Sequence, residues 1–299
     1  MALTLSTRYR KSKAGLKMKT LITLTLVAFI SLISAAQTVA GDWERVKIAT
    51  EGAYPPWNFV DASGNLVGFE IELAEDLCTR MNVACEIVPQ KWRGIIKGLN
   101  ADKYDAIMAA MSITEDRKKL VTFSRNYAVT PNVFVVRKDN PAADFHTELK
   151  QLNLDDVSPA ERATIDAIVK QFKGKIIGVQ VATTHAKFAD EYLGDYAEIR
   201  IYDFQHTIDL DLYQGRLDAV IGDFAYWLPL INSEQGKDYK IVGPHMTGGP
   251  FGGGVGVAVR KKDQDLADMF SRAIEEAIKD GTINKMAVKW FNYDASAQE

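Results

Sequence analysis

Short apolar segments rich in β-branched residues alternate with amphipathic stretches along most of the chain. The strand-like segments are residues 46–50, 105–109, 133–137, 176–180, 198–202 and 218–221. Between the first two of them, residues 69–81 have a helical period, with one apolar face formed by Leu73, Ala74, Leu77, Cys78 and Met81. This alternation predicts an α/β fold with largely parallel sheets.

The C-terminal part predicts two further helices. A helical period connects seven apolar residues, which are Leu266, Met269, Phe270, Ala273, Ile274, Ala277 and Ile278. We expect Gly281 to stop this helix and Thr282 to cap a last helix that runs to Trp290 and Phe291.

Residues 144–173 differ from their surroundings. Ser158-Pro159-Ala160-Glu161 is a capping box with proline at the first helical position. An apolar stripe follows, formed by Ile165, Ile168, Val169 and Phe172. This pattern predicts a loop followed by an extra helix, packed as a surface insertion on one of the two lobes that a chain of 299 residues is expected to form.

The first 40 residues have the composition of a secretory signal. Six basic residues and no acidic ones precede an apolar run from Leu21 to Ala36, and small residues follow as far as Ala40. The run is short for a membrane span, which needs about 20 apolar residues. We therefore expect residues 1–40 to be a cleaved signal peptide, cut after Ala36 or Ala40, and the protein to be periplasmic.

Removal of this segment makes the chain more acidic. The whole chain has 36 Lys and Arg residues against 39 Asp and Glu residues, for a net charge of −3. The exported part keeps 30 basic residues, so its net charge is about −9. That sign argues against nucleic acid or an anionic membrane as a partner.

The two cysteines, Cys78 and Cys85, both lie in the part expected to be exported. An even pair in an oxidising compartment predicts a disulfide. A metal site is the alternative, but no nearby histidine completes a set of ligands.

The sequence contains no catalytic motif of the common kinds. It has no Walker motif, no Gly-x-Ser-x-Gly elbow and no His-Glu-x-x-His, and its four histidines have no metal-ligand spacing. The glycine-rich residues 248–256 precede a strand instead of joining a strand to a helix, so we interpret them as a crossover near a lobe boundary. We predict a protein that is not an enzyme and that uses no cofactor and no metal.

A series of motifs spans nearly the whole exported part. They are Glu51-Gly52-Ala53-Tyr54-Pro55-Pro56-Trp57, Gly68-Phe69-Glu70, Tyr104-Asp105-Ala106, Ser112-Ile113-Thr114 with Arg117, Thr183-Thr184, Gly215-Arg216-Leu217-Asp218 with Asp223, and Lys289-Trp290-Phe291. In this order they resemble the polar amino-acid-binding proteins of ABC importers, the family 3 solute-binding proteins. The cysteine pair is similar to the short disulfide of the lysine/arginine/ornithine and histidine binders, whereas Thr50-Glu51-Gly52 and Gln90-Lys91-Trp92 resemble opine-binding proteins.

The resemblance implies a two-lobed periplasmic binding protein of type II, with two crossover strands as the hinge and a ligand cleft between the lobes. Lobe 1 would comprise residues 41–130 and 251–299, and lobe 2 would comprise residues 131–250 with the insertion at 144–173. A small amino-acid or opine ligand would favour the closed form, and an inner-membrane ABC permease would recognise the closed monomer.

The matching positions imply roles for individual residues. Arg117 would clamp the ligand carboxylate, because its planar fork makes two parallel hydrogen bonds. Asp223 would bind the α-ammonium group at the end of its strand. Thr183 and Thr184, before a helical stretch, would bind the carboxylate through a backbone N–H and a hydroxyl, and Ser112 would add a second hydroxyl.

The charges at these positions imply the kind of ligand. Tyr54 and Trp92 would flank the ligand's side chain, and an aromatic face attracts a cation. Glu51, Asp223 and Arg117 together carry a net charge of −1, and a buried charge needs a partner. We therefore expect a ligand with an extra positive group, arginine before lysine or ornithine.

Some positions depart from the family pattern. Ala109 and Ala110 replace a serine pair, which widens the pocket and would suit a bulkier opine such as octopine or nopaline. Asp223 argues for a free α-ammonium group and so for arginine. Gln180 stands where an apolar residue is usual, and it completes the predicted ligand-binding residues together with Ala110 and His185. A remote alternative is a periplasmic dehydratase-like enzyme on the same scaffold, for which Glu51 and His185 are the only candidate acids or bases.

Overall fold

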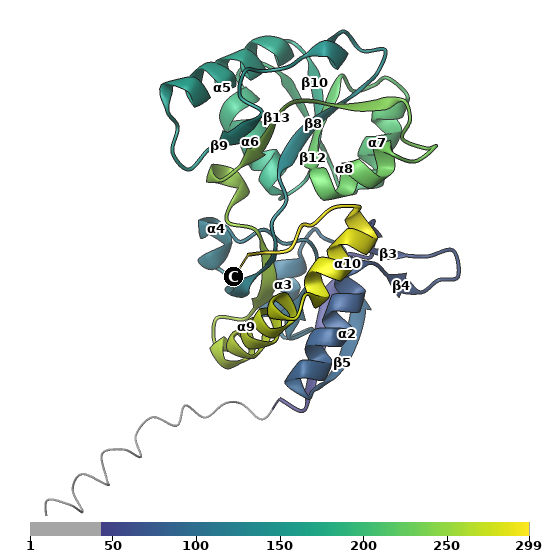
Figure 1. The fold of residues 1–299 in the computed structure, drawn as a ribbon, viewed down its shortest axis with the longest axis vertical. Coiled ribbons are helices and arrows are strands. Elements are labelled where there is room, and N and C mark those ends of the chain that lie inside the picture. Colours follow the sequence, from purple (N-terminus) through teal and green to yellow (C-terminus); the bar gives the residue numbers. More distant parts are fainter. Residues whose placement is uncertain (1–42, 299) are drawn as a thin grey trace, which may run out of the picture. The chain divides into compact units, whose positions relative to one another are not determined.

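The structure, a computed structural model, describes residues 43–298, so the predicted signal peptide lies outside the described residues (Figure 1). Most strands belong to two sheets. The five-stranded sheet has the order β5 (Ala84–Pro89), β1 (Arg45–Thr50), β6 (Ala106–Ile107), β14 (Val255–Val259), β7 (Thr122–Ala128). The six-stranded sheet has the order β11 (Glu198–Tyr202), β10 (Ile176–Gln180), β12 (Ala219–Asp223), β8 (Asn132–Arg137), β13 (Tyr239–Thr247), β9 (Gln151–Asn153).

Each sheet has its own helices. Those in the part of the chain that contains the five-stranded sheet are α2 (Phe69–Met81), α3 (Ile95–Asn100), α4 (Glu115–Lys118), α9 (Gln264–Lys279) and α10 (Thr282–Phe291). Those of the six-stranded sheet are α5 (Pro159–Phe172), α6 (Thr184–Leu193), α7 (Gln205–Tyr213) and α8 (Phe224–Ile231). A small sheet of β2 (Ala53–Tyr54), β3 (Asn58–Val60) and β4 (Leu66–Val67) precedes α2. None of the helices within residues 43–298 is long and apolar enough to cross a membrane.

The chain passes between the two sheets twice. It leaves β7 for β8 through residues 129–131, and it returns from β13 to β14 through residues 248–254, which include the 3-10 helix Gly249–Phe251. The predicted lobe boundaries at residues 130 and 250 fall within these segments.

The prediction of largely parallel sheets is only partly correct. β5, β1 and β6 are parallel, as are β11, β10 and β12, because helical crossovers connect parallel strands. β14 runs antiparallel to β6 and β7, and β8 runs antiparallel to β12 and β13. The antiparallel pairs therefore involve the strands on either side of the two passages between the sheets.

Two predicted strands differ from the observed strands by two residues at one end. The strand predicted at 105–109 is only Ala106–Ile107, because the chain turns away from the sheet before Ala110, whose φ is 48°. The strand predicted at 218–221 is Ala219–Asp223.

The segment 144–173 contains a strand that was predicted as loop. β9 pairs in parallel with the end of β13, so the segment extends the six-stranded sheet by one edge strand. The capping box at Ser158 and Glu161 is confirmed, and α5 follows it directly. Ile165, Ile168 and Phe172 are buried in the core of this sheet, which accounts for the apolar stripe.

The capping role predicted for Thr282 is wrong. Gly281, with φ at 77°, is the N-cap of α10, and Thr282 is the first helical residue. Asp280 Oδ1 accepts a hydrogen bond from the Thr282 N–H at 3.0 Å. A carboxylate just before the helix therefore satisfies a backbone donor of the first turn.

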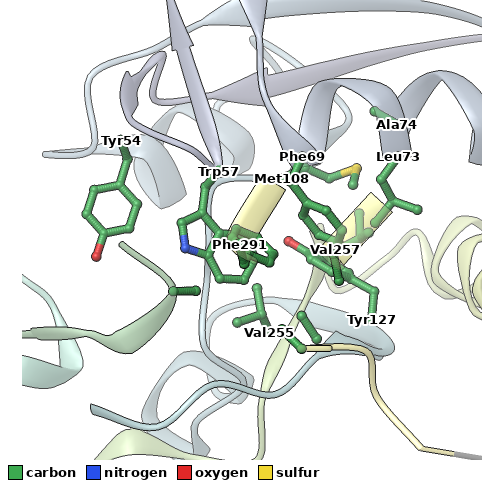
Figure 2. Packing of buried hydrophobic residues seen from close by; sticks show 14 of the residues in the cluster. Tyr54, Trp57, Phe69, Leu73, Ala74, Met108, Tyr127, Val255, Val257 and Phe291 are labelled. Carbon is green, nitrogen blue, oxygen red and sulfur yellow. The ribbon is translucent and has the colours of Figure 1, made fainter. Parts of the chain in front are cut away.

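Aromatic side chains fill the core beside the five-stranded sheet, where Figure 2 shows Trp57, Phe69, Tyr127 and Phe291 in one cluster. The ring centroids of Trp57 and Phe291 are 4.6 Å apart, and those of Phe69 and Phe291 are 4.8 Å apart. These residues come from separate stretches of the chain, so the cluster joins the C-terminal helix α10 to the N-terminal half of the lobe.

The predicted disulfide between Cys78 and Cys85 is confirmed. It joins α2 to β5 across a sequence separation of 7, with the Cα atoms 6.1 Å apart. Both thiols are used in this bond, so the alternative of a metal site at these cysteines is wrong.

Candidate ligand site

One pocket gathers side chains from the loops of both sheets. Its empty space, which includes open solvent at its mouth, is about 440 Å³. All the predicted ligand-binding residues line it, and Ala109 and Asn132 line it as well. The lining residues are Glu51, Tyr54, Trp92, Ala109, Ala110, Ser112, Arg117, Asn132, Gln180, Thr183, Thr184, His185 and Asp223.

Strand ends position many of these residues. Glu51 follows β1 directly, and the segment from Ala109 to Ser112 follows β6 in the five-stranded sheet. Gln180 is the last residue of β10 and Asp223 the last of β12 in the six-stranded sheet. The carboxyl ends of parallel strands meet at one edge of a sheet, which brings residues distant in sequence to one place.

Glu51 is a buried carboxylate, 9% exposed. Its Oε1 accepts a hydrogen bond at 2.8 Å from Gln180 Nε2, which also donates to the Asp203 carbonyl at 3.1 Å. Burial raises the pKa of Glu51 to about 7, the hydrogen bond from Gln180 lowers it, and the nearby Glu70 raises it further. The carboxyl is therefore only partly ionised at neutral pH.

Asp223 is 8% exposed and is also the N-cap of α8. Its Oδ1 accepts hydrogen bonds from the Ala225 N–H at 2.6 Å and from Thr130 Oγ1 at 2.9 Å. Burial nevertheless raises its pKa to about 7, because the loss of hydration outweighs these bonds. Glu51 and Asp223 thus place two acids, one from each sheet, in one pocket.

Arg117 is the cation of the pocket. Its Nη1 donates to the Ser112 carbonyl at 2.9 Å, and its Nη2 donates to the Ala182 carbonyl at 3.2 Å. Burial lowers its pKa to about 10, so it stays charged at neutral pH. It forms no ion pair with any carboxylate of residues 43–298, and its guanidinium carbon lies 5.2 Å from the centre of the Trp92 ring.

The start of α6 differs in one respect from the prediction. Thr183 is the N-cap, and Thr184 is already the first helical residue. The Thr183 hydroxyl donates to the Gln180 carbonyl at 2.6 Å and accepts from the Ala186 N–H at 3.1 Å, so it serves the helix end. Of the two threonine hydroxyls, only that of Thr184 has no role at the helix end.

The aromatic residues and His185 have partners in the structure. Tyr54 stacks on Tyr226, with ring centroids 4.8 Å apart. Trp92 Nε1 donates to the Val181 carbonyl at 2.9 Å, which joins loops of the two sheets. His185 Nε2 lies 2.8 Å from Asn132 Oδ1, and burial, with a contribution from Arg117, lowers the His185 pKa to about 4. The imidazole is therefore neutral at pH 7.

Asn132 was not predicted as a site residue. It is the first residue of β8, directly after the first passage between the sheets, and its Nδ2 donates to the Met246 carbonyl at 3.3 Å. A lone asparagine at a strand start carries no chemical signal in the sequence. The only indication in the sequence was that Asn132 lies just after the predicted lobe boundary at residue 130.

Two alanines at the site have backbone conformations that L-residues rarely adopt. Ala110 has φ at 48°, and Ala182 has φ at 56°. Such strain is usually found where the surrounding structure holds a functional loop in place.

Residues 43–298 contain no group of three or more His, Cys, Asp or Glu side chains placed to hold a metal ion.

Comparison with known proteins is consistent with this geometry. Residues 46–293 match the model of the bacterial extracellular solute-binding proteins, family 3. The octopine-binding periplasmic protein of Rhizobium meliloti is 36% identical over 284 residues, covering 89% of this chain and 96% of that protein. The L-arginine-binding protein of Pseudomonas aeruginosa is 34% identical over 275 residues, covering 91% of this chain and 97% of that protein.

Solved structures show the same architecture. An ancestral arginine-binding protein bound to arginine has a TM-score of 0.69 and 32% sequence identity, covering 83% of this chain and 98% of its own. The resemblance inferred from the motifs and the two-lobed α/β fold are thus both confirmed, and the chain belongs to the bacterial extracellular solute-binding proteins, family 3.

Proposed function

We propose that the chain is the substrate-binding component of an ABC importer and that it binds a cationic amino acid, arginine before lysine or ornithine. The charge of the pocket carries this proposal. Glu51 and Asp223 are both acids and Arg117 is the one cation among the described lining residues, since His185 is neutral. A ligand with two cationic groups and one carboxylate neutralises this set.

Each charged group of arginine then has a partner. The α-carboxylate binds Arg117, which forms no ion pair with a carboxylate of residues 43–298, and the Thr184 and Ser112 hydroxyls lie in the same pocket. The α-ammonium group binds Asp223. The guanidinium group binds Glu51 and displaces the Gln180 amide from it.

An opine is the second candidate, favoured by the space beside Ala109 and Ala110 and by the name of the Rhizobium meliloti relative. An opine carries a carboxyalkyl group on its α-nitrogen, and this group supplies a further carboxylate. Beside Asp223 that carboxylate would meet an acid, and no second cation lines the described pocket. Arginine therefore fits the charges better.

Contacts between the two sheets support hinge closure as the mechanism. Arg93 Nε lies 2.6 Å from Asp203 Oδ1, and Lys187 Nζ lies 2.5 Å from Asp116 Oδ2. We propose that residues 41–130 with 251–299 close against residues 131–250 around the two crossovers, as one monomer in the periplasm. An inner-membrane permease then receives the closed form.

We further propose that binding involves no turnover. Glu51 and His185, the candidate acid and base of the dehydratase alternative, are bonded to Gln180 and Asn132 in the pocket. In the proposed binding mode Glu51 faces a guanidinium group, which has no acidic C–H bond.

Calorimetric titration of refolded, ligand-free protein tests the proposal. The titrants are arginine, lysine, ornithine, histidine, glutamine, octopine and nopaline, and recovery of unchanged ligand tests for turnover. We expect arginine to bind most tightly and to be recovered intact. Tighter binding of octopine or nopaline would overturn the assignment of Asp223 to a free ammonium group.

A further inference from the structure

A buried carboxylate outside the pocket connects two of the loops that line it. Glu70, the second residue of α2, is 1% exposed, and Asn58 beside it is fully buried. Neither residue lines the pocket. Glu70 directly follows Phe69 and accepts a hydrogen bond from Tyr127, two members of the aromatic cluster that Figure 2 shows.

Three donors converge on the Glu70 carboxylate. Asn58 Nδ2 donates to Oε2 at 2.6 Å, and the Ala110 N–H donates to Oε1 at 2.7 Å. The Tyr127 hydroxyl also donates to Oε1. On its other side, Asn58 Oδ1 accepts a hydrogen bond from the Gly52 N–H at 2.7 Å.

These bonds form a continuous chain from Gly52 through Asn58 and Glu70 to Ala110. Gly52 directly follows Glu51, the proposed partner of the ligand's distal cation. Ala110 lines the pocket and precedes Ser112, whose carbonyl accepts from Arg117. The chain therefore connects the loop that presents Glu51 with the loop that supports Arg117.

The geometry requires an acceptor at both oxygens of residue 70. A backbone N–H and an amide N–H₂ can only donate, so Ala110 and Asn58 each need an oxygen opposite them. An ionised carboxylate supplies both, and the three bonds oppose the rise in the Glu70 pKa that burial causes. A glutamine at this position would supply only one.

The Ala110 backbone gives this link a specific task. Its φ of 48° is unfavourable for an alanine, so the turn persists only where other contacts hold it. The bond from the Ala110 N–H to Glu70 is such a contact. Without it the turn can relax, and Ala110 and Ser112 move relative to Glu51.

We propose that Glu70 is a positioning residue for the ligand site: its carboxylate fixes the spacing between the Glu51 loop and the Ala110–Ser112 loop. This inference rests on the proposed function. Glu70 touches no ligand and acts through the two loops.

The first variant is Glu70→Gln, measured by calorimetric titration with arginine. Its amide oxygen can face Ala110 and Tyr127, but its N–H₂ group then faces the Asn58 N–H₂ group, and the chain is broken. We expect the affinity for arginine to fall about tenfold or more, since a hydrogen bond to a charged group is lost.

The double variant Glu70→Gln with Asn58→Asp is the rescue. The amide nitrogen of the introduced glutamine can donate to one oxygen of the introduced aspartate, whose other oxygen still accepts from Gly52. Every bond of the chain is then restored, with the polarity of the central bond reversed. We expect an affinity within about threefold of the wild type.

Tyr127→Phe is the matched control, because it removes a donor to the same Oε1 but touches neither pocket loop. It should lower the melting temperature and leave the affinity within about threefold of the wild type.

The results separate the alternatives. Wild-type affinity in Glu70→Gln overturns the proposal, as does an equal loss in Tyr127→Phe at a similar melting temperature. Should Glu70→Gln not fold, the folded double variant decides: wild-type affinity supports the link, and tenfold weaker binding overturns it. If the wild type itself binds none of the amino acids, the proposed function fails instead.

Discussion

Replacing Glu51 by glutamine removes the buried charge on which the choice of ligand depends. Glu51 is 9% exposed, and its carboxylate accepts a hydrogen bond from the Gln180 amide. A cation about 4 Å away interacts with it by about 4 kcal/mol at an effective dielectric constant of about 20. Glutamine keeps one acceptor oxygen but cannot make the charged hydrogen bond, and such a bond contributes about 1.5–3 kcal/mol. Arginine affinity should therefore fall about 10- to 150-fold.

The assay is calorimetric titration at pH 8, where the Glu51 carboxyl, with a pKa of about 7, is mostly ionised. Citrulline, the uncharged isostere of arginine, serves as the second ligand and should bind the Glu51→Gln variant no more weakly than it binds the wild type. Glu234→Gln is the control variant, because it removes the same charge from a side chain that is 90% exposed. The reasoning is refuted if arginine loses less than about threefold, or if citrulline loses as much as arginine.

Four further outcomes follow from the charges. Burial raises the pKa of Glu51 and Asp223 to about 7, and a bound cation favours their ionised forms. Arginine affinity should therefore rise with pH from about 5.5 to 8 and then level off. An affinity that does not change over this pH range would contradict the reasoning. The same raised pKa values mean that, without ligand, the folded protein binds more protons at Glu51 and Asp223 than the unfolded chain does. Its unfolding free energy should therefore decrease as pH rises from about 4.5 to 7. Arg117→Lys should weaken arginine binding about 10- to 100-fold, since lysine cannot make the bidentate contact, and equal affinity in titration would exclude a carboxylate at this position. Reversing one charge of the exposed Arg93–Asp203 pair should weaken binding about two- to fivefold at low salt, and reversing both should restore it, which a salt series of the four proteins will show.

Local patterns predicted the elements well where a short stretch of sequence decides the structure. The strands 176–180 and 198–202 and the capping box at Ser158 appear as predicted, since their signals are periodicity and one helix start. Other features depend on where the chain passes between the sheets. They are the antiparallel pairing of β8 with β12, that of β14 with β6, and the edge strand β9. No local pattern encodes such long-range pairing.

The candidate site divides in the same way. Its lining residues were found through motifs that resemble a family, and physical chemistry gave the sign of its charge. Asn132 was missed because an asparagine at a strand start has no distinguishing chemistry. The role of Glu70 was also missed, because it depends on backbone donors at Ala110 and on Asn58, 12 residues earlier in the chain. The sequence shows only an acid in the first turn of a helix.

The hydrogen bond between Gln180 and Glu51 has a consequence for the timing of transport. The binding protein of an importer has to release its ligand as well as bind it. When the ligand leaves, the Gln180 amide can again donate a hydrogen bond to Glu51 Oε1. The Glu51 carboxylate is then not left without a hydrogen-bond partner. In the proposed binding mode this exchange would lower the barrier to release, and the length and polarity of residue 180 would then adjust the residence time of the ligand.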